Sequence, residues 1–88
     1  MNEDVFGGEK LQFPVECHYK IIAEGESVRV LLEIVLEELG ITAPLGAGNH
    51  SSHGKYVTFN FDWTVDSQEM MERIDARLRS VKGVRIVL

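Results

Sequence analysis

Hydrophobic and polar residues alternate in two segments of the chain, and this alternation predicts two half-buried strands. In the first, residues 13–21, the odd positions are largely apolar and share one face, while Glu16, His18 and Lys20 lie on the other. The second, residues 56–65, alternates most regularly. Its inward positions are Val57, Phe59, Phe61, Trp63 and Val65.

Two other segments carry apolar residues at helical spacing. The first, residues 28–39, follows Gly25 and Ser27, and the Ser27 hydroxyl is expected to accept a hydrogen bond from an opening amide of the helix. Gly40 can close this helix in a left-handed conformation. Asp66 and Glu69 predict a capping pair for the second helix. The apolar stripe of that helix is Met71, Ile74, Leu78 and Val81.

The remaining segments complete a pattern of strand, helix, strand, strand, helix, strand. Residues 41–50 contain Pro44, Gly46 and Gly48, which suit an edge strand or a loop. Residues 84–88 form the last strand. Right-handed crossovers then predict an α+β, ferredoxin-like βαββαβ fold, with strand order 4-1-3-2 and both helices on one face of the antiparallel sheet.

The inward faces of these elements predict one hydrophobic core, as an 88-residue chain allows. We expect a single ferredoxin-like domain over residues 13–88, preceded by a mobile acidic tail over residues 1–12. The predicted core consists of Phe13, Val15, Tyr19, Ile21, Leu31, Leu32, Val35, Phe59, Phe61, Trp63, Ile74, Leu78 and Ile86.

Charge and cysteine content narrow the classes of partner and location. The net charge of −5 repels phosphate backbones at long range, which disfavours nucleic acid as a partner. Cys17, the single cysteine, cannot form an intramolecular disulfide. Because no signal-like segment follows Met1 and no apolar run approaches the length of a membrane span, we expect a cytoplasmic protein that does not bind membranes.

Three short motifs carry a resemblance to a known family. They are Phe13-Pro14 leading into Tyr19-Lys20-Ile21, the turn Ser51-Ser52-x-Gly54-x-Tyr56, and Gly83-Val84-Arg85 followed by Val87-Leu88. With them the chain resembles the YbeD-like family of small bacterial proteins. The resemblance implies a ferredoxin-like fold close to ACT domains, which bind small effectors and regulate enzymes, and a family function that is not established. The family usually has a glycine soon after the first strand, where this chain has Ala23 and delays its glycine to Gly25.

Candidate chemistry in the sequence is sparse. His50 and His53, with Cys17 or His18, do not fix the third and fourth donors that a tight metal site needs, so we predict no metal and no cofactor. The loop after the first strand is acidic, unlike the basic phosphate-binding loop of acylphosphatase. His18 and Asp62 can pair across strands, and without a nucleophile this pair is expected to be structural.

These observations, together with what the family resemblance implies, predict a non-catalytic, ACT-like regulatory or protein-interaction module of the bacterial cytoplasm, over the ferredoxin-like domain of residues 13–88. Its partner is expected to be a protein or a small-molecule effector, and its state a monomer or weak homodimer. The predicted interaction edge is the last strand, Val84, Arg85, Ile86, Val87 and Leu88. The alternative is a metabolite sensor. Its predicted ligand residues are Glu24, Gly25 and Ser27 in the first strand–helix loop, and Ser51, Ser52, Gly54 and Tyr56 in the turn before the third strand.

Overall fold

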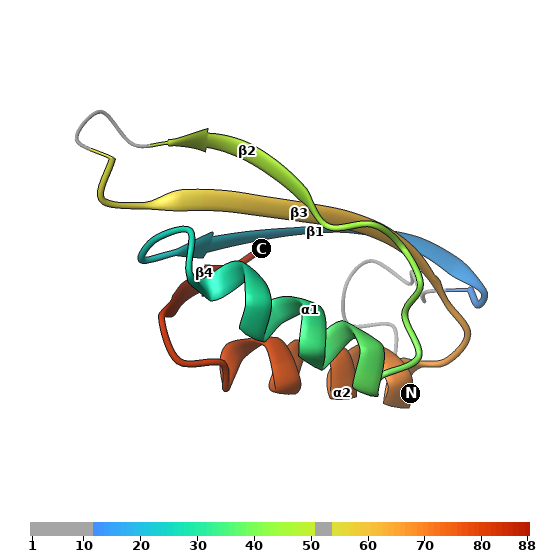
Figure 1. The fold of residues 1–88 in the computed structure, drawn as a ribbon. Helices are drawn as coiled ribbons and strands as arrows, with labels where there is room; N and C mark the ends of the chain where they lie inside the picture. The colour runs from blue at the N-terminus through green and yellow to red at the C-terminus, as the bar shows by residue number, and fades with distance from the viewer. Residues whose placement is uncertain (1–11, 51–53) are drawn as a thin grey trace, which may run out of the picture.

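The computed structural model describes residues 12–50 and 54–88, which form four strands and two helices (Figure 1). The predicted tail, apart from Gln12, lies outside the described residues. Neither helix in the described ranges combines the length and apolar character that crossing a membrane requires. The elements are β1 (Val15–Ala23), α1 (Val28–Glu38), β2 (Gly46–His50), β3 (Val57–Val65), α2 (Gln68–Arg79) and β4 (Val84–Val87).

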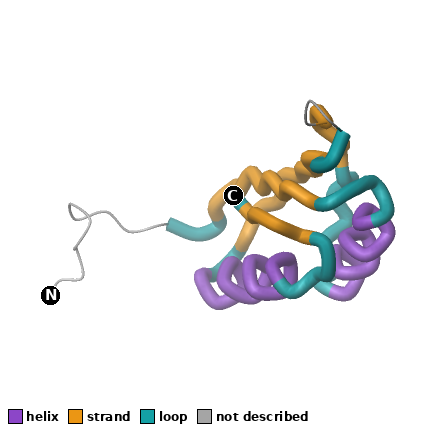
Figure 2. The backbone as a smooth tube through the Cα atoms, turned by 90° about the vertical axis from the view of Figure 1, so that its left-hand side faces the viewer, coloured by secondary structure: helices purple, strands orange, loops and turns teal. Residues whose placement is uncertain are grey.

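The strands form one antiparallel sheet in the order β2-β3-β1-β4, which confirms the predicted ferredoxin-like topology. Both helices cover the same face of this sheet and leave the other face open (Figure 2). The central strands pair without interruption, from Val15 opposite Val65 to Ala23 opposite Val57. This unbroken register places the polar positions of β1 and β3 side by side on the helix-free face.

The core lies between the sheet and the helices. Phe13, Val15 and Trp63 are half-buried and pack against it. From the predicted set, the buried residues are Tyr19, Ile21, Leu32, Val35, Phe59, Phe61, Ile74 and Leu78. The burial of Phe59 and Phe61 agrees with the inward face assigned to the aromatic residues of β3.

The predictions for Leu31 and Ile86 are wrong, because these side chains are 42% and 45% exposed. Leu31 lies one residue before the fully buried Leu32, so the helical rotation turns it away from the sheet. The pairing of β1 with β4 is irregular between Ile22 and Ala23, and Ile86 lies opposite Ile22 on the helix-free face. Val87, opposite Ile21, is buried in its place.

Two of the three predicted helix signals are also corrected. The Ser27 side chain makes no capping hydrogen bond, and α1 instead begins with a backbone turn in which the Val28 amide donates to the Gly25 carbonyl. At α2 the cap is Ser67, not Asp66, and its hydroxyl accepts from the Met70 amide at 3.1 Å. Gly40 follows α1 with a φ of 77°, as predicted.

Tyr19 places a hydroxyl group inside the core. Its ring stacks on Phe61 with the centroids 4.8 Å apart, and its oxygen has no hydrogen-bond partner within the described residues. Burial, together with the neighbouring Cys17 thiol, raises the pKa of Tyr19 to about 12. The hydroxyl is therefore neutral at physiological pH.

Candidate functional site

The predicted ligand loop, the described part of the predicted turn and the last strand meet at one end of the sheet, where β1 ends and β3 and β4 begin (Figure 1). The Arg85 guanidinium donates to the Glu24 carboxylate at 2.7 Å. This hydrogen bond, and an electrostatic interaction with Tyr56, raise the pKa of Arg85. Glu24, Tyr56 and Arg85 thus form one polar group, drawn from three separate segments.

The first strand–helix loop is fastened to the last strand through its backbone as well. The Glu24 amide donates to the Gly83 carbonyl at 2.8 Å, and Gly25 follows with a φ of 142°. Ser27 is exposed at the start of α1. The loop residues predicted to bind a ligand are therefore held in place at the molecular surface.

Only part of the predicted turn can be placed. Ser51 and Ser52 lie outside the described residues, as does His53. Gly54 is exposed with a φ of 67°, and Tyr56 is half-buried. The Lys55 ammonium lies 5.7 Å from the centroid of the Tyr56 ring, within the range of a cation–π contact.

The outer edge of the sheet at β4 combines outward-facing backbone groups with exposed apolar side chains. Lys20 of β1 and Leu88 exchange both backbone hydrogen bonds, at 3.2 and 2.8 Å. Val87 precedes Leu88 and lies opposite Ile21 at a non-hydrogen-bonded position, so its N–H and C=O groups point away from β1. Arg79 of α2 donates to the Val87 carbonyl at 3.2 Å. Ile86 and Leu88, on the helix-free face of this edge, are 45% and 66% exposed.

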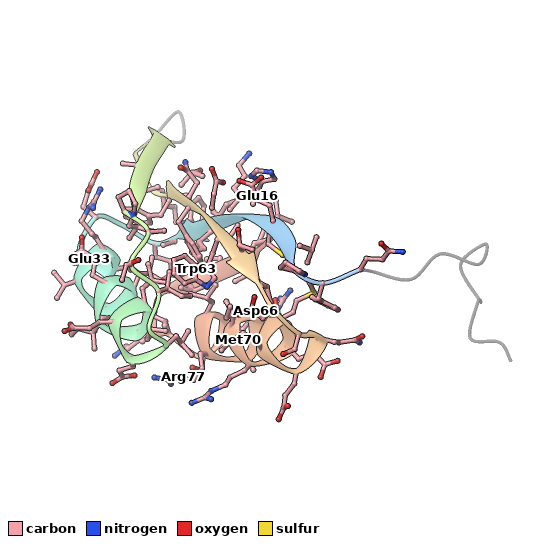
Figure 3. The ribbon with its side chains drawn as sticks, turned by 90° about the vertical axis from the view of Figure 1, so that its right-hand side faces the viewer. Glu16, Glu33, Trp63, Asp66, Met70 and Arg77 are labelled. Atoms are coloured by element: carbon pink, nitrogen blue, oxygen red, sulfur yellow. The ribbon has the colours of Figure 1, made fainter. Side chains whose placement is uncertain are left out.

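A second polar group lies on the helix-free face, at the middle of the sheet. His18 Nδ1 and Asp62 Oδ1 are 2.8 Å apart across β1 and β3, which confirms the predicted cross-strand pair. Glu16, on the side of the sheet away from the helices (Figure 3), brings a third ligand atom within 4.8 Å of the other two. The hydrogen bond to Asp62, the charge of Asp62 and, to a smaller extent, the charge of Glu16 raise the pKa of His18.

Sequence reasoning did not include Glu16 in this group. The available signal was its position two residues before His18 on an alternating strand, which puts both side chains on one face. The prediction of no metal considered His50 and His53 together with Cys17 or His18, and it did not consider Glu16 or Asp62 as donors.

A surface hollow of about 420 Å³ lies at the C-terminal end of α1. Its walls are Glu33, Leu36 and Glu37 of the helix, together with residues 40–45 of the segment that leads to β2. Because the predicted ligand loop precedes the N-terminal end of α1, this hollow and the predicted ligand residues lie at opposite ends of the helix. No pattern in the sequence predicts this hollow.

The model of a family described as "Protein of unknown function (DUF493)" matches residues 8–88, which confirms the YbeD-like resemblance. A solution structure of HP0495 from Helicobacter pylori is 19% identical with a TM-score of 0.80, and the alignment covers 100% of this chain and 96% of that one. A second solution structure, described as a hypothetical protein, HP0495, is 20% identical with a TM-score of 0.64 and coverage of 94% and 100%. The structural agreement with these chains shows a shared fold. Among curated proteins, none matches the chain.

Proposed function

The chain belongs to the DUF493 family, and we propose that it is a non-catalytic regulatory or protein-interaction module of the bacterial cytoplasm. In this proposal a protein partner, or a second copy of the chain, adds a strand to β4 and extends the sheet. Neither nucleic acid nor a membrane is the partner. The observation that carries the proposal is the exposed apolar edge of β4, formed by Ile86 and Leu88 beside outward peptide groups of Val87.

An added strand gains from both features of this edge. Backbone groups of an outer strand pair with those of an incoming strand, and neighbouring side chains supply selectivity. Ile86, at 45% exposure, and Leu88, at 66%, would lose contact with water when a partner covers them. Ile22, half-buried and opposite Ile86, continues the apolar surface onto β1.

Arg79 regulates access to the edge in this proposal. Its guanidinium donates to the Val87 carbonyl and, at 2.8 Å, to the Asp75 carboxylate one turn earlier in α2. An incoming strand takes over the carbonyl from Arg79. The arginine therefore favours partners whose own contacts exceed this one part-buried hydrogen bond.

The test compares Val87→Pro with Val87→Ala. Both variants lose the buried valine side chain, but only proline removes the outward amide, and the ladder to β1 uses the neighbouring residues. We expect a photo-crosslinker at position 86 to give discrete adducts in bacterial cells. These adducts should persist in Val87→Ala and disappear in Val87→Pro. Circular dichroism verifies that both variants are folded. Sedimentation shows whether the adduct is a homodimer. Adducts that are equally abundant in both variants would contradict the proposal.

The second candidate is a metabolite sensor, and the convergence of Glu24, Tyr56 and Arg85 favours it. A carboxylate and a guanidinium held side by side can exchange their mutual ion pair for the ammonium and carboxylate groups of an amino acid. Selective binding to the native state raises the unfolding temperature. A thermal screen of amino acids, lipoate-like acids and nucleotides tests this function. A specific shift should disappear in Arg85→Gln and survive in Arg77→Gln, a control outside the group.

A further inference from the structure

We propose that Glu16, His18 and Asp62 form a binding site for a divalent first-row transition-metal ion on the helix-free face of the sheet. The three side chains come from the two central strands, and one potential ligand atom from each lies within 4.8 Å of the others. The site is distinct from the β4 edge and from the group at Glu24.

The register of the sheet explains why these side chains meet. Glu16 and His18 are two residues apart on β1, and Asp62 is the direct cross-strand partner of His18. At these positions β1 and β3 pair with each other in unbroken register, so the hydrogen-bond ladder between them holds the Cα positions of the three ligands. A site built on paired strands is better preorganised than one built on a loop.

The chemistry of the donors selects the class of ion. One imidazole nitrogen and two carboxylates suit zinc, iron, cobalt or nickel, whereas magnesium prefers oxygen ligands alone and keeps much of its water. Three protein donors leave coordination positions open for water or an external ligand, as in metal sites that are not purely structural. The site is therefore expected to hold an exchangeable ion.

The surroundings allow an ion to enter and to keep water. His18 and Asp62 are 72% and 64% exposed, so their side chains can turn toward a shared ion without unpacking the core. A surface hollow of about 270 Å³ lies beside the two carboxylates, with Trp63 and Thr64 among its walls. The two negative charges attract a cation, and the His18–Asp62 hydrogen bond gives way where the metal takes Nδ1 of His18.

The experiment titrates the full chain, free of any affinity tag, with zinc ions at neutral pH. Calorimetry gives the stoichiometry, and NMR of the histidine side chains shows which ring binds. We expect saturable one-to-one binding. The affinity should fall at least 10-fold in His18→Asn, because loss of an outer-shell partner already lowers metal affinity by about 10–100-fold and His18 is a direct ligand in this proposal. Glu16→Gln and Asp62→Asn should weaken it as well. Equimolar magnesium should not displace the zinc.

Two controls separate this site from other donors. Glu72→Gln removes an exposed carboxylate of α2, on the helix-covered side of the sheet, and the double variant His50→Asn, His53→Asn removes the other histidines. Both should bind zinc like the unaltered chain. The proposal is overturned if no saturable binding occurs, if His18→Asn binds with unchanged affinity while folded, or if the double variant loses the binding.

Discussion

Replacing Phe61 with alanine tests the assignment of the two faces of β3, on which the core and both surface proposals depend. Phe61 is 3% exposed and stacks on Tyr19 at a centroid distance of 4.8 Å. Truncating a buried phenylalanine costs about 3–5 kcal/mol. The stacked partner favours the upper part of that range, because an aromatic pair contributes about 0.5–1.5 kcal/mol beyond burial. A domain of this size is expected to have a total stability of about 4–13 kcal/mol.

The assay is urea unfolding monitored by circular dichroism, with Asn60→Ala as the matched control. Asn60 is the preceding residue of β3 and is exposed on the opposite face, so its truncation should change the free energy of unfolding by no more than about 0.5 kcal/mol. The m-values of both variants should equal that of the unaltered chain. A one-residue slip of register exchanges the two faces. The assignment would be refuted if Phe61→Ala lowered the free energy of unfolding by less than about 1 kcal/mol, or if Asn60→Ala lowered it by more than Phe61→Ala does.

Two further predictions concern the His18–Asp62 pair and the turn before β4. In metal-free protein the pKa of His18 lies above its ordinary value of 6.5, so the pair stabilises the fold fully below pH 6.5 and loses this contribution as the pH rises through the raised pKa. NMR titration should show the pKa falling toward 6.5 in Asp62→Asn, and an unchanged value would contradict the pairing. Gly83→Ala should destabilise more than Gly54→Ala in thermal unfolding. Both glycines have positive φ, but an added Cβ at Gly83 would lie 2.7 Å from a methyl group of α1, and at Gly54 it meets open space; equal losses would contradict this packing.

Much of the fold could be predicted from the sequence because period-2 alternation and helical spacing report directly on burial. The alternation in residues 13–21 and 56–65 places Tyr19, Phe59 and Phe61 inward, as observed. The same alternation places His18 and Asp62 outward on two strands that the topology makes neighbours. The sequence alone therefore predicts the cross-strand pair of these two side chains, as observed.

The errors arise where local pattern competes with tertiary structure. Residues 84–88, predicted as the last strand, contain Arg85 as their single polar residue, so alternation cannot decide which of Ile86 and Val87 faces inward. The irregular pairing near Ala23 decides it. At the helix starts, Ser27 and Asp66 both have capping side chains, but the neighbouring backbone turn and Ser67 satisfy the amides instead.

The helix-free face divides into two parts that can be varied independently. Glu16, His18 and Asp62 form its polar part along the first half of β1, while Ile22 and Ile86 form the apolar part beside the β4 edge. A substitution more than about 7–10 Å away, with no shared partner, usually acts additively. Loss of metal binding should therefore leave crosslinking at the edge intact, and loss of the edge contact should leave metal affinity intact. If His18→Asn altered both, the ion would be part of the partner interface, with its open coordination positions filled by a ligand from the partner.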